Sequence, residues 1–257
     1  MADSANYALH RPELREALER GEAKIRKLMA SDVLELADDT VLIEADRPHD
    51  YVYRMRHGWA GRVRTIPDGR SHYILVFLPG DLFAVKSMFV RKHPDAVQLL
   101  SRAVVERMHY RDLQAAYATD PDISLRCTWQ VVEEERRLHN WVVGLGRGSA
   151  EERFAALICQ LRGRLQLSGA IARDAQTFQL PMTQEQLADH LGISPVHVNR
   201  VLRVFREAGL LEWKSRLLTV LDPAGLGDVA SPLLDSYEKS EPAFSGDTDN
   251  GTSRASK

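Results

Sequence analysis

Two helical patterns with clear start signals lie close together near the C-terminal end of the sequence. Thr183 and Gln186 have the spacing of a capping box, and Ser194 followed by Pro195 marks the start of a second helix. Gly192 supplies the tight turn between the two helices. Two capped helices joined by a short turn that contains glycine are typical of a helix-turn-helix unit, so the sequence predicts that motif here.

The second helix has one apolar face and one face that carries arginine. At about 100° per residue, the apolar positions that cluster together are Val198, Val201, Leu202 and Phe205. The opposite side carries Val196, Arg200 and Arg203, with His197 and Asn199 beside them. Arginine can donate two hydrogen bonds to guanine, one to O6 and one to N7, and an exposed valine can pack on a thymine methyl group. The outward face therefore predicts a helix that reads DNA, although similar helix pairs also occur as packing units.

The segment after the second helix predicts a small hairpin. Apolar runs at 210–213 and 217–220 flank a basic tip that contains Lys214 and Arg216. Such a hairpin is the wing of a winged helix, whose tip contacts the DNA backbone, and the alternative is a solvated turn. Residues 147–222 hold ten Lys or Arg and eight Asp or Glu, a net of +2 against -2 for the whole chain. The positive charge therefore lies in the part that would face DNA.

The first 120 residues have the pattern of a β-roll preceded by a short helix. Leucine and isoleucine at helical spacing predict that helix, with an interruption at Gly21. Short β-branched or aromatic runs separated by turn residues then follow, at 40–43, 51–53, 62–66 and 71–78. Asp68-Gly69 is a strong hairpin signal. Strands this short and this closely spaced are typical of a sandwich or roll.

From Pro121 to Gly146 the sequence predicts one helix, which would be about 37 Å long. Apolar residues recur every seven positions along it, as in a two-stranded seam. We expect a homodimer contact through the seam residues Val131, Leu138, Val142 and Leu145. A second stripe, which includes Trp129 and Val132, would then pack on the β-roll. The alternative is a helix with a wide buried face inside a single chain.

These patterns divide the chain into a β-roll sensor domain at 1–120, a dimerisation helix at 121–146, a winged helix-turn-helix at 147–222, and a short helix with a disordered tail at 223–257. The expected fold class is α+β. No apolar run approaches the roughly 20 residues of a membrane span, and the start lacks a secretion signal, so we expect a cytoplasmic protein without a membrane partner. We find no catalytic set and no metal motif, which argues against an enzyme.

Several segments carry a resemblance to a known family. They are His57-Gly58-Trp59-Ala60, Asp68-Gly69-Arg70, the stretch 77–82 (FLPGDL), the stretch 148–153 (GSAEER) and the stretch 191–200 (LGISPVHVNR). Together with the order β-roll, long helix, winged helix, they make the chain up to about Asp222 similar to the Crp/Fnr family of bacterial transcription regulators. The resemblance implies a homodimer on a palindromic operator of double-stranded DNA, with one recognition helix in each of two successive major grooves. RNA polymerase is a further candidate partner.

The resemblance and the helix geometry together select the residues that we expect at the DNA. Base reading falls on Val196, Asn199 and Arg200. The expected backbone contacts are Thr183, Gln184, Ser194, His197, Arg203, Lys214 and Arg216.

The β-roll departs from the cyclic-AMP receptors of this family. Their phosphate cassette has a Gly-Glu-Leu stretch and a later Arg-Ser or Arg-Thr pair, where this chain has Ala84-Val85-Lys86 and Pro94-Asp95. A phosphate site without that arginine, and with an aspartate beside it, would repel an anion. We therefore expect no dependence on cyclic AMP and no cofactor.

Two residue types bear on other ligands. Cys127 and Cys159 cannot form the cysteine cluster of the oxygen-sensing branch, and we expect both to be small buried residues. Nine histidines keep one alternative open, a ligand- or haem-binding sensor whose DNA binding is weak or architectural. No pair has ligand spacing, and His139 on the long helix is the one candidate.

Overall fold

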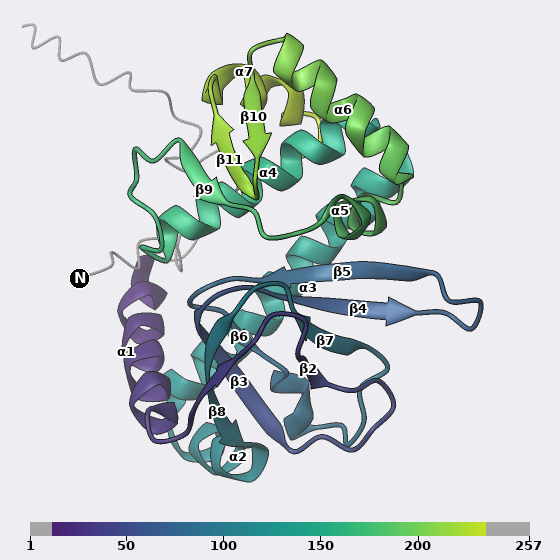
Figure 1. The fold of residues 1–257 in the computed structure, drawn as a ribbon. Coiled ribbons are helices and arrows are strands. Elements are labelled where there is room, and N and C mark those ends of the chain that lie inside the picture. The colour runs from purple at the N-terminus through teal and green to yellow at the C-terminus, as the bar shows by residue number, and fades with distance from the viewer. Residues whose placement is uncertain (1–11, 235–257) are drawn as a thin grey trace, which may run out of the picture.

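A computed structural model of the protein describes the structure of residues 12–234. The chain forms a β-roll at one end, a long helix beside it, and a second body of helices with a small sheet at the other end (Figure 1). The predicted disordered tail at 236–257 lies outside the described residues. None of the helices described is both long enough and apolar enough to cross a membrane.

The β-roll consists of two antiparallel sheets of four strands each, in the orders β1-β8-β3-β6 and β2-β7-β4-β5. Their bounds are β1 Val33–Leu36, β2 Val41–Ile43, β3 Tyr51–His57, β4 Ala60–Thr65, β5 Ser71–Phe77, β6 Leu82–Phe83, β7 Ala96–Leu99 and β8 Ala103–His109, with a 3-10 helix η1 at Val85–Met88. Apolar side chains from both sheets meet in one core, in which the rings of Phe77 and Phe83 stack at 4.7 Å. The structure confirms the predicted roll.

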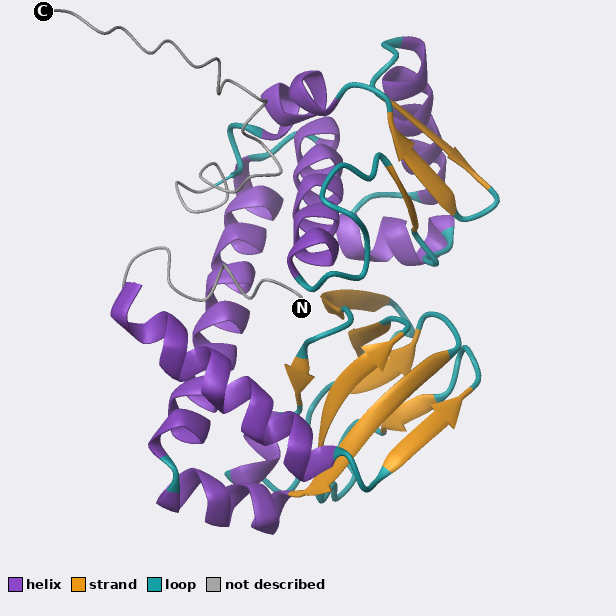
Figure 2. Cartoon of the chain, turned by 90° about the vertical axis from the view of Figure 1, so that its left-hand side faces the viewer, coloured by secondary structure: helices purple, strands orange, loops and turns teal. Residues whose placement is uncertain are grey.

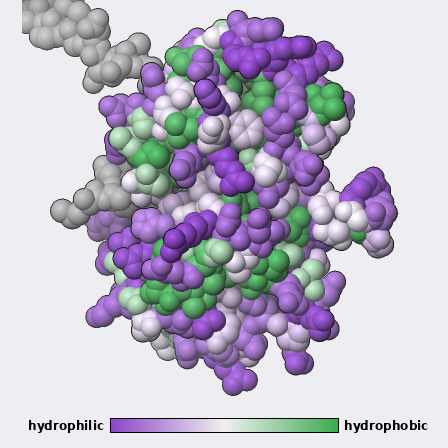
Figure 3. Space-filling view, viewed as in Figure 1, coloured by the Kyte–Doolittle hydropathy of each residue, from purple (hydrophilic) through white to green (hydrophobic). Residues whose placement is uncertain are grey.

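The hairpin between β4 and β5 turns where the sequence predicts it. Gly69 has a φ of 90° and donates its backbone N–H to the Ile66 carbonyl oxygen at 2.9 Å. In the space-filling view this hairpin stands out from the body, with hydrophilic surface at its tip (Figure 3).

Helix α3 spans Pro121–Arg147 and runs from the β-roll to the second body (Figure 2). It follows α2, Tyr110–Thr119, after a single residue, because Asp120 caps its start by accepting from the backbone N–H groups of Asp122 and Ile123. The predicted long helix is therefore present, and its end differs from the prediction by one residue.

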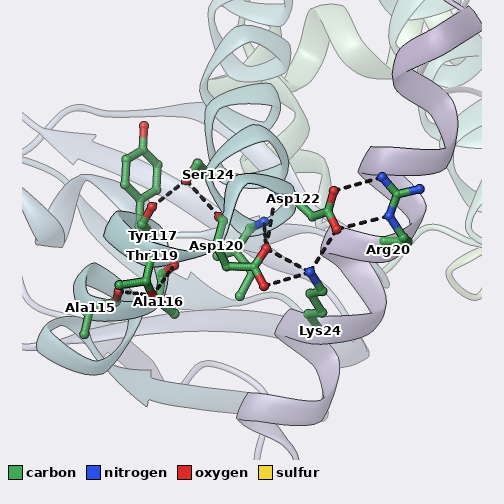
Figure 4. Close-up of polar contacts among 10 residues, drawn as sticks. Arg20, Lys24, Ala115, Ala116, Tyr117, Thr119, Asp120, Asp122 and Ser124 are labelled. Carbon is green, nitrogen blue, oxygen red and sulfur yellow. Dashed lines mark hydrogen bonds and ion pairs between the residues drawn. The ribbon is translucent and has the colours of Figure 1, made fainter.

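Helix α1, Pro12–Met29, is continuous, so the predicted interruption at Gly21 is wrong. Helix α1 packs so closely against the start of α3 at Gly21 that only glycine fits. A Cβ at this position would lie 2.3 Å from the Asp122 carbonyl oxygen. Ion pairs surround this contact, from Arg20 to Asp122 at 3.1 Å and from Lys24 to Asp120 at 2.7 Å (Figure 4). The glycine serves the packing of two helices and does not end one.

Glu22 of α1 is half-buried between two arginines. Its carboxylate oxygens accept from Arg54 Nε of β3 and Arg126 Nε of α3, both at 2.8 Å. Burial by itself would raise the pKa of Glu22, but the charges and hydrogen bonds of Arg126 and Arg54 outweigh it and lower that pKa. The carboxylate therefore stays ionised and ties α1 to both the sheet and the long helix.

The second body begins with α4, Ala150–Leu167, which starts at the predicted capping box of Ser149 and Glu152. Its other elements are β9 Thr177–Gln179, α5 Gln184–Leu191, α6 Pro195–Glu207, β10 Leu211–Lys214, β11 Leu217–Val220 and α7 Pro223–Ala230, with sheet order β10-β11-β9. Phe154 of α4 and Phe205 of α6 are fully buried in its core. That core continues into the β-roll through Trp59, Tyr73 and Leu78, so the two bodies share an apolar contact.

Candidate nucleic-acid interface

The helix-turn-helix is formed by α5 and α6, and local hydrogen bonds fix both starts. Thr183 Oγ1 accepts from the Gln186 backbone N–H, and Ser194 Oγ accepts from that of His197. Gly192 ends α5 with a φ of 65°, a conformation that side chains other than glycine seldom adopt. The caps and turn that the sequence predicts are therefore present.

Helix α6 buries one face and exposes the other. Val198, Val201 and Phe205 are 0–1% exposed, whereas Val196 is 79% exposed. Asn199, Arg200 and Arg203 are exposed as well, and His197 is half-buried. An apolar side chain that is this exposed, beside arginines, contributes nothing to the core of its own chain.

One contact of this surface was not predicted from the sequence. Asn199 Nδ2 donates to Gln184 Oε1 at 2.9 Å and to the Pro195 carbonyl oxygen at 3.2 Å. The first bond joins the start of α5 to the second turn of α6, so two of the expected DNA contacts hold each other in place. Their spacing along the chain gives no periodic signal, which is why the sequence did not reveal the pair.

The wing is the hairpin of β10 and β11. Its two central residues, Ser215 and Arg216, have φ of 52° and 63° without being glycine, which is the conformation of a type I′ turn. The Arg216 carbonyl oxygen accepts from the Leu180 backbone N–H at 2.8 Å, and both Lys214 and Arg216 are exposed. The tip is thus fixed by its backbone, while its cationic side chains extend into solvent.

The expected dimer seam is placed only in part on the outer face of α3. Val131 and Val142 are 52% and 66% exposed and Leu145 is 38% exposed. Leu138, in contrast, is partly buried against the core of the β-roll, so it belongs to its own chain. In the second stripe Val132 is 45% exposed, so the expectation that this stripe packs on the roll is wrong at that residue, whereas Trp129 is half-buried. The face that α3 buries is largely polar and contains Arg126, Gln130 and Arg137.

Internal ion pairs surround the residues that we compare with the phosphate cassette. Asp95 is buried and accepts from Arg64 Nε at 2.6 Å, and Lys86 Nζ lies 3.6 Å from its other carboxylate oxygen. Arg62 donates to Glu134 of α3 at 2.8 Å. Burial lowers the pKa of Lys86, the charge of Arg62 lowers it further, and Asp95 works in the opposite direction. The cations that could hold a phosphate are thus already paired with carboxylates.

The cysteines and histidines do not form a metal centre in the part of the chain described. Cys127 and Cys159 are both free and buried, as expected, and burial raises the pKa of the Cys127 thiol to about 11. No group of three or more His, Cys, Asp or Glu among residues 12–234 could hold a metal ion. His139 is exposed, and its Nδ1 lies 3.4 Å from Glu135 on the same helix.

A β-roll joined by a long helix to a winged helix-turn-helix defines a class of DNA-binding transcription regulators. Residues 33–120 match the family model described as the cyclic nucleotide-binding domain, and residues 152–229 match that of the Crp-like helix-turn-helix domain. The two matches lie on the two bodies of the structure. The chain belongs to the Crp/Fnr family.

Several relatives agree with this placement. The transcriptional activator protein FnrA of Stutzerimonas stutzeri is 27% identical over 185 residues, 72% of this chain and 74% of that protein. The nitrogen fixation regulation protein FixK of Bradyrhizobium diazoefficiens is 26% identical over 194 residues, which cover 75% of this chain and 79% of that protein. The structure of FixK2 from Bradyrhizobium japonicum matches with a TM-score of 0.69 at 24% identity, over 77% of this chain and 96% of that one. The predicted family and fold class are confirmed, and the protein is a transcription regulator rather than an enzyme.

Proposed function

We propose that this protein is a homodimeric regulator that binds a palindromic DNA operator and does not depend on cyclic AMP. The observation that carries the proposal is the outer face of α6, where Val196, Asn199 and Arg200 are exposed and none serves the core. A helix that presents an apolar tip and arginines from its first turns suits the major groove, where base pairs differ in their donors, acceptors and methyl groups.

The exposed side chains divide into those that read bases and those that fix position. Arg200 can take guanine O6 and N7, Val196 can pack on a thymine methyl group, and Asn199 can bind adenine or a phosphate. The backbone contacts that we propose are Thr183, Gln184, Ser194, His197, Arg203, Lys214 and Arg216. Thr183 and Ser194 use their hydroxyl oxygens as caps, so each can still donate its O–H to a phosphate.

A second copy of the chain would cover the outer face of α3. The valines at 131, 132, 142 and 143 are all exposed, and an exposed apolar face of this kind is typical of a protein–protein contact. Pairing through a two-fold axis would place the two α6 helices in successive major grooves, about 34 Å apart, and would require a palindromic operator. RNA polymerase is a candidate partner of the bound dimer, and the cytoplasm is the compartment in which such a complex would act.

The test compares Arg200→Ala with Lys214→Ala on an operator selected by the wild-type protein from random duplexes. Arg200→Ala should cost about 1–3 kcal/mol per half-site and flatten the preference at one base pair. Lys214→Ala should weaken all duplexes alike and reduce the slope of log affinity against log salt by about one. Binding would be measured on the operator and its single-base variants across a salt series.

Circular dichroism serves as the folding control for both variants, since both side chains are exposed. If Arg200→Ala ranks the single-base variants of the operator by affinity in the same order as the wild-type protein, Arg200 does not read a base. That role would then remain with Asn199 and Val196. If the wild-type protein bound specific and random duplexes equally well, the architectural alternative would replace the proposal.

A further inference from the structure

A small cavity lies where the β-roll, the long helix and the DNA-binding body meet. Its volume is about 40 Å³, and α3, α4, β5 and α5 all contribute to its wall. The polar side chains of the lining are Arg137, Asn140 and Trp141 of α3, Gln160 and Arg164 of α4, and His190 of α5. A cavity of this size has room for a few water molecules or one small ion, and it excludes nucleotides and other organic ligands.

Two buried N–H donors in the cavity wall have no acceptor among the described residues. They are Nη1 of Arg137 and Nε1 of Trp141. The Arg137 side chain is only 5% exposed, and its Nε already donates to the Glu133 carbonyl oxygen at 3.1 Å. The Trp141 ring stacks on the His190 ring at 4.2 Å, so it cannot turn its N–H elsewhere without losing that contact. Buried donors without an acceptor are uncommon and costly, and two of them meet at this one cavity.

The charges around the cavity are not balanced by its lining. Arg164 donates to Asp81 and to the Val76 carbonyl oxygen, while Arg137 Nη1 lies 3.9 Å from the same Asp81 oxygen, beyond hydrogen-bonding distance. Glu133, the other carboxylate close by, pairs with Arg136 at 3.2 Å. The lining residues include no Asp or Glu in the part of the chain described.

His190 carries no charge at the cavity, and its ring offers Nε2 as an acceptor rather than a further donor. Its Nδ1 hydrogen-bonds to the Tyr73 carbonyl oxygen, and burial lowers its pKa to about 4, so the ring is neutral at ordinary pH. Arg137 and Arg164 therefore share the carboxylate of the half-buried Asp81, beside a cavity in which Arg137 Nη1 and Trp141 Nε1 are left without an acceptor among the described residues. Uncompensated buried charge is costly, and a negative ion at this place would remove the cost.

We infer that the cavity binds a small inorganic anion of the size of chloride, held by Arg137 Nη1 and Trp141 Nε1. An anion there would contact the long helix and lie against both bodies, so it would hold their relative arrangement. The inference does not depend on the proposed DNA contacts, since none of those residues lines the cavity.

The experiment measures chloride binding by the full chain through the broadening of the ³⁵Cl resonance, with competition by bromide. Trp141→Phe retains the stacking on His190 but deletes one donor, and Arg137→Gln deletes the charge. Because hydrogen bonds to charged groups are the strong ones, each change should weaken the saturable binding by roughly tenfold or more. Trp213→Phe is the matched control, because Trp213 Nε1 is also buried without a partner among residues 12–234 but lies outside the cavity lining.

Crystals soaked in sodium bromide give the second measurement. An anomalous peak in the cavity of the wild-type protein, absent in Trp141→Phe, supports the site. Equal broadening by the wild type and Trp141→Phe, or a cavity that holds only water in the bromide crystal, overturns the inference. Circular dichroism shows whether Arg137→Gln folds, and the tryptophan variant decides the question if it does not.

Discussion

His190 illustrates what happens to a single residue at the contact between the two bodies. The sequence places it near the end of the first helix of the motif, where it looks like a surface or hydrogen-bonded histidine. The structure buries it between Trp141 and the β5 backbone. Sequence pattern could assign it to the apolar side of α5, but the ring that covers it comes from a helix almost fifty positions earlier, and local spacing carries no information about that.

The burial of His190 makes stability depend on pH. Its pKa falls from 6.5 to about 4, so between these values the native state binds fewer protons than the unfolded state. The contribution of His190 to the free energy of unfolding is therefore complete above about pH 6.5. It decreases as the pH falls toward 4, by up to about 1.4 kcal/mol per pH unit. We expect His190→Asn, whose amide can still donate to Tyr73, to flatten that dependence in denaturant titrations at a series of pH values.

His93 provides the internal control for this measurement. It is also buried, and its Nε2 shares a hydrogen bond of 2.8 Å with Ser87 Oγ. Burial lowers the pKa of His93 to about 4. The His190 variant should therefore retain a residual slope from His93. A slope identical to that of the wild type would contradict the assignment of His190 as a buried neutral ring.

At the scale of elements, caps and turns were predictable from the sequence because they depend on neighbours. Ser149, Thr183 and Ser194 each bond within three residues, and all three helix starts are where the sequence predicts them. The faces of α3 were less predictable, since apolar residues surround that helix on several sides. Its buried face follows from long-range ion pairs such as Arg126 with Glu22, which periodicity does not reveal.

The corrected face of α3 determines which substitution tests the dimer. Val142 is 66% exposed, so Val142→Asp leaves the core of its own chain intact and places a charge in the proposed interface. An unpaired charge in that position should cost about 3–5 kcal/mol, and we expect a monomer at micromolar concentration in sedimentation equilibrium. Leu138 is unsuitable, because its substitution would also disturb the β-roll.

Val41→Asp is a matched control for this test. Val41 is 50% exposed on β2, away from α3, so it introduces the same charge without reaching the proposed interface. A Val142→Asp protein that sediments like the Val41→Asp protein, as a dimer, would show that the outer face of α3 is not the contact. A wild-type monomer would contradict the dimer itself.

At the scale of the whole molecule, a β-roll ligand could act on DNA binding only by favouring one arrangement of the two bodies over another. Asp95 pairs with Arg64 and Lys86, in the stretch that we compare with the phosphate cassette of cyclic-AMP receptors. We expect calorimetric titration with cyclic AMP to show no binding and operator affinity to stay unchanged. A micromolar dissociation constant together with a matching gain in operator affinity would refute this. Asp95→Asn, which frees the cations, is the variant in which some nucleotide affinity should appear.

The docking of α1 on α3 bears on how the chain is made. Arg20 and Asp122, which bond at this contact, lie 102 positions apart, and the close approach at Gly21 needs the backbone of α3 to be in place. At about 5–20 residues per second, a ribosome adds the missing segment in roughly 5–20 s. Helix α1 is therefore made well before α3, and until α3 emerges it has an uncovered apolar side and its Glu22 lacks the Arg126 partner. During that interval a chaperone has access to a surface that the finished protein no longer presents.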